Sequence, residues 1–344
     1  MPLDSLKILF CFHPLPVRWN HGIALLSSLC KSRGIAVDLC LLETKQAFFK
    51  VLKENHYNFI CFSVTTIREY IRLVPFAKLA KDAGYKTLIG GTWLSLRWPV
   101  DEEIFDGVCR GDGETLPDFL LNWDTSLFKS PMIYRDLNML PLLDYELFEG
   151  IPLKRGIPEI DNKFALPYIS SRGCPSNKCT FCQAKHQPFY RVRTKVERDL
   201  REISEKYKPD IFFMGDALLP YDSKRWRGSW RDFRYPFVAY IRADIKPDLL
   251  LWLIDRGMKG CAFGVESGDE TYRNTVLKKN LTDDQLWNTI EILEKHSIWY
   301  SASFISKTPG ERMHHQMKTA QMINKIKGYT FLAPYEELLC PQER

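Results

Sequence analysis

Two kinds of apolar pattern alternate along the first third of the chain. Short apolar runs with the character of strands are separated by amphipathic stretches in which apolar residues recur every three or four positions. The runs predict strands at residues 7–12, 36–43, 58–64, 86–91 and 106–114, and the amphipathic stretches predict helices at 22–34, 46–56 and 72–84. This alternation with short connections predicts a parallel sheet with helices on both faces.

A second alternation of the same kind begins at residue 165. Its apolar runs predict strands at residues 164–171, 209–216, 237–244, 260–267, 298–306 and 329–335. Its amphipathic stretches predict helices at residues 195–207, 247–257, 283–296 and 311–326, whereas residues 219–236 carry no helical stripe. Repeated units of strand and helix predict a full or partial barrel, in which chemistry takes place at the carboxyl ends of the strands.

The stretch between the two alternations has no sustained period. Residues 122–164 contain scattered prolines and predict an interdomain connection. We therefore expect an α/β protein with a Rossmann-like, doubly wound domain at 1–121, a linker at 122–164 and a partial barrel of six strand–helix units at 165–344. The length of 344 residues agrees with two domains.

Composition narrows the class of protein. Apolar residues make up 45% of the chain and charged residues 26%, which excludes a fibre, a collagen and a wholly disordered chain. No apolar run approaches the ~20 residues of a membrane span, and the amino-terminal residues do not form a signal peptide. We therefore expect a cytoplasmic protein without a membrane partner.

Basic and aromatic residues are interleaved in two stretches, 185–201 and 223–235. Such interleaving can bind RNA by stacking and phosphate contact. Acidic residues recur in both stretches, however, and the net charge is only +6, so we do not expect nucleic acid as a partner. The second stretch replaces an expected barrel helix and is a candidate contact for a substrate, although tryptophans such as Trp226 and Trp230 are more often packing residues than part of a recognition motif.

Small residues gather where three predicted strands of the first domain end. They are Ser63, Thr65 and Thr66, then Gly90, Gly91 and Thr92, then Gly111, Gly113 and Glu114. Ligands of open parallel sheets bind outside the carboxyl ends of the strands, so three such loops on one edge predict a site for a large ligand. No G-x-G-x-x-G follows the first strand, which argues against a nicotinamide or flavin. Each glycine by itself is also explained as the cap of a strand or helix.

Three of the ten cysteines stand together in one loop. Cys174, Cys179 and Cys182 have the spacing C-x4-C-x2-C, directly after a predicted strand, whereas most of the other seven lie in apolar runs where a free cysteine packs as a small hydrophobe. His186 would complete a zinc site with four protein ligands. A [4Fe–4S] cluster held by only three cysteines instead leaves one iron open to an exogenous ligand. The position of the loop at the end of a strand favours the iron cluster.

The segment SRGCPSNKCTFCQ resembles the cluster loop of radical S-adenosylmethionine (SAM) enzymes, including Phe181 before the third cysteine. The usual family spacing is C-x3-C-x2-C, so one residue is inserted here. The resemblance implies that Gly215 and Asp216, at the end of the second barrel strand, contact the methionine amino group. It also implies that Glu266, in FGVESG, accepts hydrogen bonds from the ribose hydroxyls. FISKTPGE then resembles F-I-x-G-x-P-G-E, with Lys307 in place of the glycine.

The first domain resembles the cobalamin-binding domains that are fused to radical SAM cores. The segments that carry this resemblance are YNFICFSVTT, KTLIGGTW and DGVCRGDGETLPDFL. It implies that the small residues described above bind cobalamin, and that Thr65, Thr66 and Arg68 approach its lower face. The D-x-H-x-x-G motif that supplies an axial histidine is absent, since His13 and His21 lack its spacing. The alternatives are that Arg68 is a solvated residue at a helix start and that the domain has lost cobalamin.

The two resemblances together imply a cobalamin-dependent radical SAM methyltransferase. Its cofactors would be a [4Fe–4S] cluster, S-adenosyl-L-methionine and cobalamin. A 5′-deoxyadenosyl radical would activate an unactivated substrate carbon, and methylcobalamin would supply the methyl group. One alternative is a cobalamin-assisted rearrangement or cyclisation without methyl transfer, and another is a zinc-bearing binding protein that is not an enzyme.

The family resemblance also implies partners. A flavodoxin- or ferredoxin-type protein would donate electrons to the cluster. Little of the chain follows the last predicted strand, so we expect an open barrel mouth and a large substrate such as a peptide or a protein side chain. Substrate specificity would then come from the barrel mouth, from the domain interface or from the substrate itself.

Overall fold

The computed structural model describes residues 6–14, 19–95, 99–123, 136–153, 157–176, 178–182, 189–219 and 234–335. His186, Trp226 and Trp230 lie outside these residues, as does most of the stretch 219–236. The chain divides into two compact units. Residues 1–135 and 139–155 belong to the first unit, and residues 136–138 and 156–339 belong to the second.

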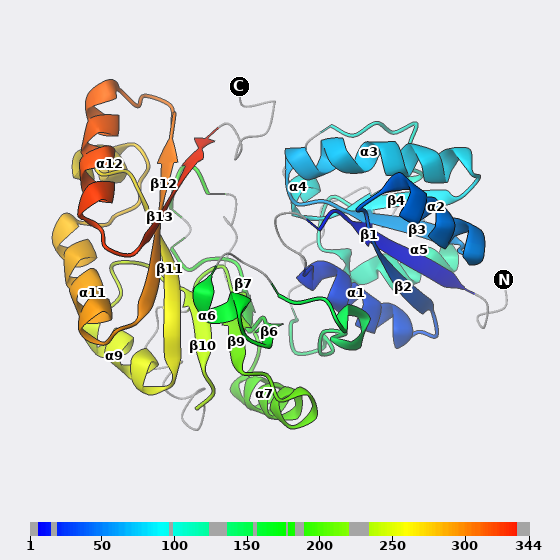
Figure 1. The fold of residues 1–344 in the computed structure, drawn as a ribbon, viewed down its shortest axis with the longest axis horizontal. Helices are drawn as coiled ribbons and strands as arrows, with labels where there is room; N and C mark the ends of the chain where they lie inside the picture. The colour runs from blue at the N-terminus through cyan, green and yellow to red at the C-terminus, as the bar shows by residue number, and fades with distance from the viewer. Residues whose placement is uncertain are drawn as a thin grey trace. The chain divides into compact units, whose positions relative to one another are not determined.

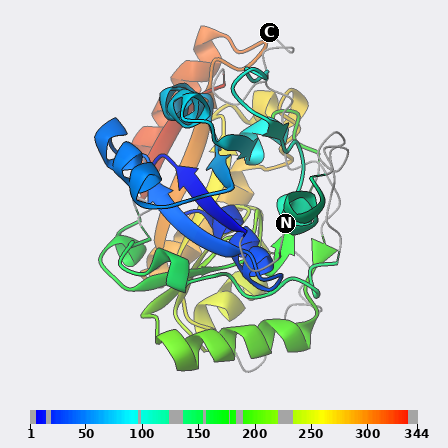
Figure 2. The ribbon, with the colours of Figure 1, turned by 90° about the vertical axis from the view of Figure 1, so that its right-hand side faces the viewer.

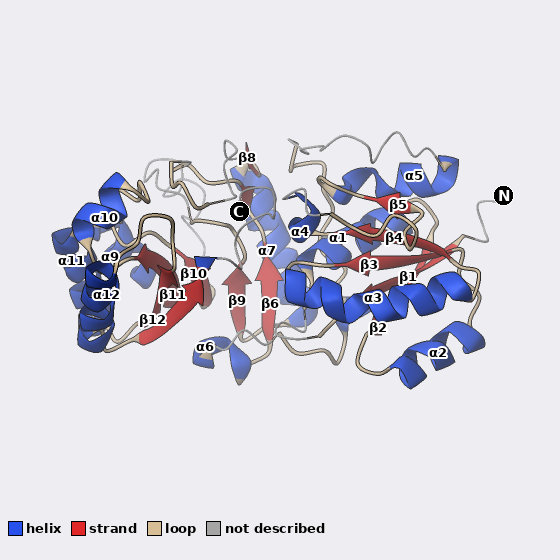
Figure 3. Cartoon of the chain, turned by 90° about the horizontal axis from the view of Figure 1, so that it is seen from above, coloured by secondary structure: helices blue, strands red, loops and turns tan. Residues whose placement is uncertain are grey.

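The first unit contains a five-stranded sheet in which every pair of neighbours is parallel. Its strands are β1 (Lys7–Phe12), β2 (Ala36–Leu41), β3 (Phe59–Ser63), β4 (Lys86–Gly90) and β5 (Gly107–Val108). Its helices are α1 (His21–Lys31), α2 (Lys45–Glu54), α3 (Ile67–Asp82), α4 (Thr92–Ser95) and α5 (Leu116–Asn122). The strand order β2-β1-β3-β4-β5 places a topological switch point between β1 and β3. Helices α2 and α3 cover one face of the sheet, and α1 and α5 cover the other (Figure 1, Figure 3).

Local sequence signals determine how these elements form. Asn20, Thr44 and Thr66 each accept a hydrogen bond from a backbone N–H in the first turn of the helix that follows, so α1, α2 and α3 all begin at a polar cap. Strand β1, the deep blue arrow in Figure 2, pairs with both β2 and β3. It is buried from Ile8 to Phe12, because a parallel strand between two helical layers has no solvent face.

The second unit contains a six-stranded parallel sheet. Its strands are β6 (Ala165–Tyr168), β9 (Ile211–Met214), β10 (Phe237–Tyr240), β11 (Met258–Glu266), β12 (Trp299–Ser306) and β13 (Tyr329–Pro334). Its helices are α6 (Pro158–Asp161), α7 (Arg193–Tyr207), α9 (Pro247–Asp255), α10 (Glu270–Thr275), α11 (Asp283–Lys295) and α12 (Met313–Lys325). A short antiparallel pair, β7 (Ser171–Arg172) and β8 (Phe189–Tyr190), follows β6 in the sequence.

The six strands lie in the order in which they occur in the chain. Each strand therefore returns beside its predecessor, as repeated units of strand and helix require. The prediction of an α/β protein with parallel sheets is confirmed. None of the helices in the described ranges combines the length and the apolar character that a membrane crossing would need.

Part of the expected linker 122–164 packs on the first unit. Asp144 accepts a hydrogen bond from the hydroxyl of Ser27 in α1 at 2.6 Å. The indole of Trp19 stacks on the ring of Phe148 with centroids 4.2 Å apart, and both side chains are buried. The irregular sequence of this segment therefore reflects a mostly non-repetitive stretch, with one short 3-10 helix at Glu146–Phe148, that packs on α1 and buries apolar side chains without a sustained period.

Gly91 provides a test of the close approach between two strand-end loops. It follows β4 with φ at +118°, and a Cβ built there would lie 2.1 Å from the carbonyl oxygen of Val64. We expect Gly91→Ala to lower the free energy of unfolding by about 3 kcal/mol or more, because strain of ~1–2 kcal/mol adds to a collision with backbone. The measurement is the shift of the urea midpoint, followed by circular dichroism.

The matched control is Gly84→Ala. Gly84 also has a positive φ, +86°, but a Cβ there meets nothing within 4 Å. This variant should show only the backbone strain of ~1–2 kcal/mol. Equal losses in the two variants would contradict the role of the Val64 contact.

Candidate functional site

The cysteine loop begins at the carboxyl end of the first strand of the second unit. After β6, the short strand β7 leads into Gly173, whose φ of +85° is a conformation that glycine adopts without steric penalty. Cys179 is buried, and Cys174 and Cys182 are half-buried. All three thiols therefore belong to a loop at the sheet edge where ligands of parallel α/β proteins bind.

The three sulfurs do not converge on a single point. A four-coordinate zinc ion holds sulfur ligands at 2.3 Å, which places those sulfurs about 3.8 Å apart. Within the described ranges, the one group whose three ligand atoms all lie within 4.8 Å of one another is Asp269, His314 and His315. The three cysteine thiols do not form a group of this kind in the described ranges.

Thr180 anchors the cysteine loop to the segment that follows α10. Its backbone N–H donates to the carbonyl of Leu277 at 3.1 Å, and its hydroxyl donates to the carbonyl of Val276 at 3.0 Å. Because Thr180 lies between Cys179 and Cys182, these two bonds fix the part of the loop that carries two of the three thiols.

Glu266 is the last residue of β11, and its side chain pairs with a lysine. The ammonium of Lys279 lies 2.7 Å from Oε1 of Glu266, and both side chains are at least nine-tenths buried. The same ammonium lies 5.7 Å from the centre of the Phe181 ring. The structure thus brings Glu266 and Phe181 to one lysine. Nothing in the sequence distinguishes Lys279 from the adjacent Lys278, so the pairing of Lys279 with Glu266 could not be predicted from the sequence.

The backbone at Glu266 is strained. Its φ is +73°, an uncommon value for a residue other than glycine, and the pairing of β11 with β12 shifts register between Gly264 and Glu266. A Cβ on Gly264 would lie 1.8 Å from Oε1 of Glu266, so the carboxylate folds back over a position that only glycine leaves open. Irregularities of this kind gather at functional sites, where they redirect a side chain.

Asp216 and Gly215 follow β9, next to the strand that carries the cysteine loop. The Asp216 carboxylate is buried and accepts hydrogen bonds from the backbone N–H of Ser170 at 3.1 Å and from the hydroxyls of Ser170 and Ser171 at 2.9 and 2.5 Å. Burial raises the pKa of Asp216 above its ordinary value. The backbone N–H of Gly215 donates to the carbonyl of Tyr168 at 2.8 Å. The side chain expected to contact an amino group therefore ties the ends of β6 and β9 together.

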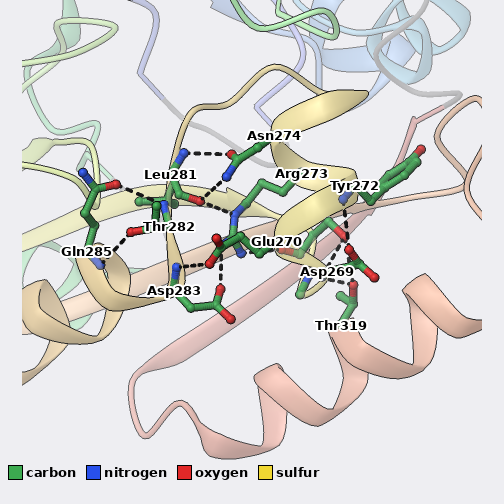
Figure 4. Close-up of polar contacts among 12 residues, drawn as sticks. Asp269, Glu270, Tyr272, Arg273, Asn274, Leu281, Thr282, Asp283, Gln285 and Thr319 are labelled. Atoms are coloured by element: carbon green, nitrogen blue, oxygen red, sulfur yellow. Dashed lines mark hydrogen bonds and ion pairs between the residues drawn. The ribbon is translucent and has the colours of Figure 1, made fainter.

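Arg273 organises the segment between β11 and α11 (Figure 4). Its side chain is fully buried, and its guanidinium donates to the carbonyls of Leu281 at 2.8 Å and Ser267 at 2.9 Å and to the carboxylate of Asp283 at 2.6 Å. Asn274 adds two hydrogen bonds to the backbone of Leu281. Arg273 therefore binds both ends of this segment, at Ser267 and at Asp283.

The close group of Asp269, His314 and His315 has a structural explanation. Asp269 caps the first turn of α10 and pairs with the ammonium of Lys318 at 2.8 Å. Nδ1 of His315 accepts a hydrogen bond from the backbone N–H of Arg312 at the start of α12. The Lys318–Asp269 pair joins α12 to α10, and the other two contacts cap the starts of these helices.

In the first unit, the side chains after β3 take part in the start of α3. Thr65 donates to the carboxylate of Glu69 through its backbone N–H at 2.6 Å and through its hydroxyl at 2.7 Å. Thr66 caps the helix, and Arg68 is exposed in its first turn. The two threonines therefore shape the loop, and Arg68 is the charged side chain that this loop presents at the carboxyl edge.

The other candidate residues of the first unit lie after β4 and β5 on the same edge. They are Gly90, Gly91, Thr92, Gly111, Gly113 and Glu114. The loops after β3 and β4 touch, because the backbone N–H of Val64 donates to the carbonyl of Gly90 at 3.0 Å. The loop before α1 joins them through Asn20, whose amide donates to the hydroxyl of Ser63 at 3.0 Å. Asn20 carries no sequence signal beyond that of a helix cap.

Substitution of Asp216 tests the junction between β6 and β9. We expect Asp216→Ala to lower the free energy of unfolding by about 2 kcal/mol, because three buried donors lose their acceptor. Asp216→Asn keeps one acceptor oxygen and should lose less. The measurement is the urea midpoint of the cofactor-free protein at several pH values.

The pH dependence gives a second readout of the same variants. The pKa of Asp216 is raised in the native state. At pH values just above the ordinary carboxyl pKa, the native protein therefore keeps a proton on Asp216 that the unfolded chain has lost. The wild type should therefore lose stability as pH rises through that interval, and Asp216→Asn should lack this component. An identical pH profile for the two proteins would contradict the assignment.

Comparison with known proteins agrees with this geometry. Residues 168–323 match the model of the radical SAM superfamily, and no curated protein sequence matches the chain. Two similar solved structures are of the radical SAM methyltransferase TsrM from Kitasatospora setae. The one with tryptophan substrate and a SAM analogue is 13% identical, with a TM-score of 0.72 over 95% of this chain and 73% of that chain. The one with cobalamin and a [4Fe–4S] cluster is 12% identical, with a TM-score of 0.73 over 96% and 72%.

At this level of identity, the two solved structures establish a similarity of fold alone. The similarity extends over both units of the chain, since nearly all of it is covered. The family match, in turn, covers the second unit from the end of β6 into α12. Residues 168–323 of this chain therefore form a radical SAM domain.

Proposed function

We propose that this protein is a cobalamin-dependent radical SAM methyltransferase that methylates an unactivated carbon. The observation that carries the proposal is the C-x4-C-x2-C loop at the carboxyl end of β6, within a radical SAM domain. The similarity to TsrM supports the cobalamin component, because it extends over the first unit as well as the second.

Cys174, Cys179 and Cys182 are the residues that would hold a [4Fe–4S] cluster. Their donor chemistry fits, because thiolates are the ligands of such clusters and three of them leave one iron for SAM. When bound and reduced, the cluster supplies the electron for radical chemistry from SAM. The protein's contribution is to hold the loop through Thr180.

Glu266 is the residue that would hold the adenosine end of SAM. A carboxylate accepts hydrogen bonds from both hydroxyls of a ribose, and such charge-assisted bonds are strong. Lys279 neutralises Glu266 in the buried site and orients it through one oxygen, Oε1. The neighbouring Phe181 offers an apolar ring beside this pair. Gly215 and the backbone of Asp216 follow β9, the neighbour of the strand that leads into the cysteine loop, and would complete the methionine end.

Cobalamin would lie on the carboxyl edge of the first unit. Glycines at 90, 91, 111 and 113 leave the backbone of this edge without bulky side chains, and Gly91 allows the loops after β3 and β4 to pack against each other there. Ser63, Thr92 and Glu114 add polar groups at this edge, and Arg68 adds a positive charge. When bound, cobalamin supplies the carrier of the methyl group.

Iron and sulfide analysis tests the cluster assignment. Anaerobically reconstituted protein should contain about four irons and four sulfides per chain. Alanine at any of Cys174, Cys179 or Cys182 should remove most of the iron and the brown absorbance. Cys261→Ala is the control, because this thiol is buried within β11 and should not affect iron content. Zinc without iron in the wild type would overturn the proposal.

Product analysis tests methyl transfer itself. With cobalamin, a reductant, methyl-deuterated SAM and a candidate acceptor, the label should appear on an acceptor carbon together with S-adenosylhomocysteine. Peptides and small metabolites should both be offered, because we propose a peptide or protein side chain as acceptor and a flavodoxin- or ferredoxin-type protein as the reductant. Formation of 5′-deoxyadenosine with an isomerised product, and without S-adenosylhomocysteine, would show a rearrangement enzyme instead.

A further inference from the structure

Arg242 lies two residues beyond β10, and its guanidinium is held among several partners at once. It forms a two-pronged contact with Asp244, with Nε and Nη2 at 2.8 and 3.1 Å from the two carboxylate oxygens. Nη2 also donates to the carbonyl of Lys279 at 2.6 Å, and Nη1 donates to the hydroxyl of Ser176 at 3.0 Å. The side chain is 8% exposed, so these contacts form away from bulk water.

Ser176 belongs to the segment of the cysteine loop between Cys174 and Cys179, which contains four residues. A stretch of this length has many accessible conformations unless contacts fix it. The hydrogen bond from Arg242 attaches this segment to the end of β10, just as the bonds of Thr180 attach the other half of the loop to the residues after α10.

Lys279 connects the same guanidinium to the glutamate site. Its carbonyl accepts from Arg242, while its ammonium pairs with Glu266. One arginine therefore contacts both the loop that bears Cys174 and the residue that orients Glu266. A lysine could not replace it in this arrangement, because a single ammonium cannot reproduce the planar fork that reaches three differently placed acceptors.

We propose that Arg242 is a positioning residue that fixes the cysteine loop relative to Glu266, with Ser176 as its point of attachment on the loop. This inference rests on the proposed function, since it concerns the relative placement of the cluster ligands and the SAM-binding carboxylate. Arg242 acts through Ser176 and Lys279 and need not touch either cofactor. Its effect should therefore be seen in how SAM perturbs the cluster, while the amount of cluster stays the same.

The experiment compares Arg242→Lys, Ser176→Ala and Arg256→Lys with the wild type after anaerobic reconstitution. Iron content is measured first, and the electron paramagnetic resonance (EPR) spectrum of the reduced protein is then titrated with SAM. Arg256 is the matched control, because it is a largely buried arginine at the end of α9, on the opposite edge of the sheet, and contacts Trp252.

We expect Arg242→Lys to retain wild-type iron content but to bind SAM about tenfold more weakly, as substitutions behind a ligand shell do. Its SAM-induced change in the EPR spectrum should be altered as well. Ser176→Ala should change both quantities in the same direction by a smaller factor, and Arg256→Lys should change neither. If Arg242→Lys does not fold, the iron content, EPR spectrum and SAM affinity of Ser176→Ala test the proposal instead.

Two results would overturn the proposal, and they are distinguishable. Wild-type iron, EPR spectra and SAM affinity in both Arg242→Lys and Ser176→Ala would overturn this inference and leave the proposed function intact. A wild-type protein that contains no iron–sulfur cluster would overturn both.

Discussion

The buried guanidinium of Arg273 is the interaction on which the functional edge of the second unit depends. A charge without solvent contact is tolerated only when its hydrogen bonds are satisfied, and here the acceptors are the backbone of Ser267 and Leu281 and the carboxylate of Asp283. The segment between β11 and α11 is therefore held in one arrangement. The carbonyls that receive Thr180 and the lysine that pairs with Glu266 both belong to this segment, so the cysteine loop and the glutamate take their positions from it.

Parallel topology accounts for how residues far apart in the sequence come to one place. In the second unit, the cysteine loop, Asp216, Arg242 and Glu266 all follow strands that run in the same direction, so their loops emerge on one edge of the sheet. The first unit repeats this logic with the loops after β3, β4 and β5. The helices bury the faces of the sheet, so the sheet provides most of the stability. The loops at its edge can vary in sequence and can hold the functional residues.

Much of the fold could be predicted from the sequence, because apolar runs of strand length and amphipathic stretches alternate clearly. The cysteines and Glu266 could be placed at strand ends as well, since the cysteines follow a predicted strand, Glu266 stands at the end of another, and each belongs to a compact motif. The contacts among them could not be predicted. Lys279 reaches Glu266 only because Arg273 folds the intervening segment, and the serines that hold Asp216 belong to a strand end 45 residues away. Such pairings depend on tertiary geometry, for which a single sequence carries no periodic signal.

The segment around Asp144 and Phe148 has a consequence for where this protein can be divided. It covers α1 and Trp19, although it follows the last helix of the first unit by more than twenty residues. A fragment cut at the end of α5 would expose the stacked indole and leave the hydroxyl of Ser27 without its carboxylate. A piece of the first unit that keeps its own interior closed therefore includes Asp144 and Phe148, beyond the end of α5.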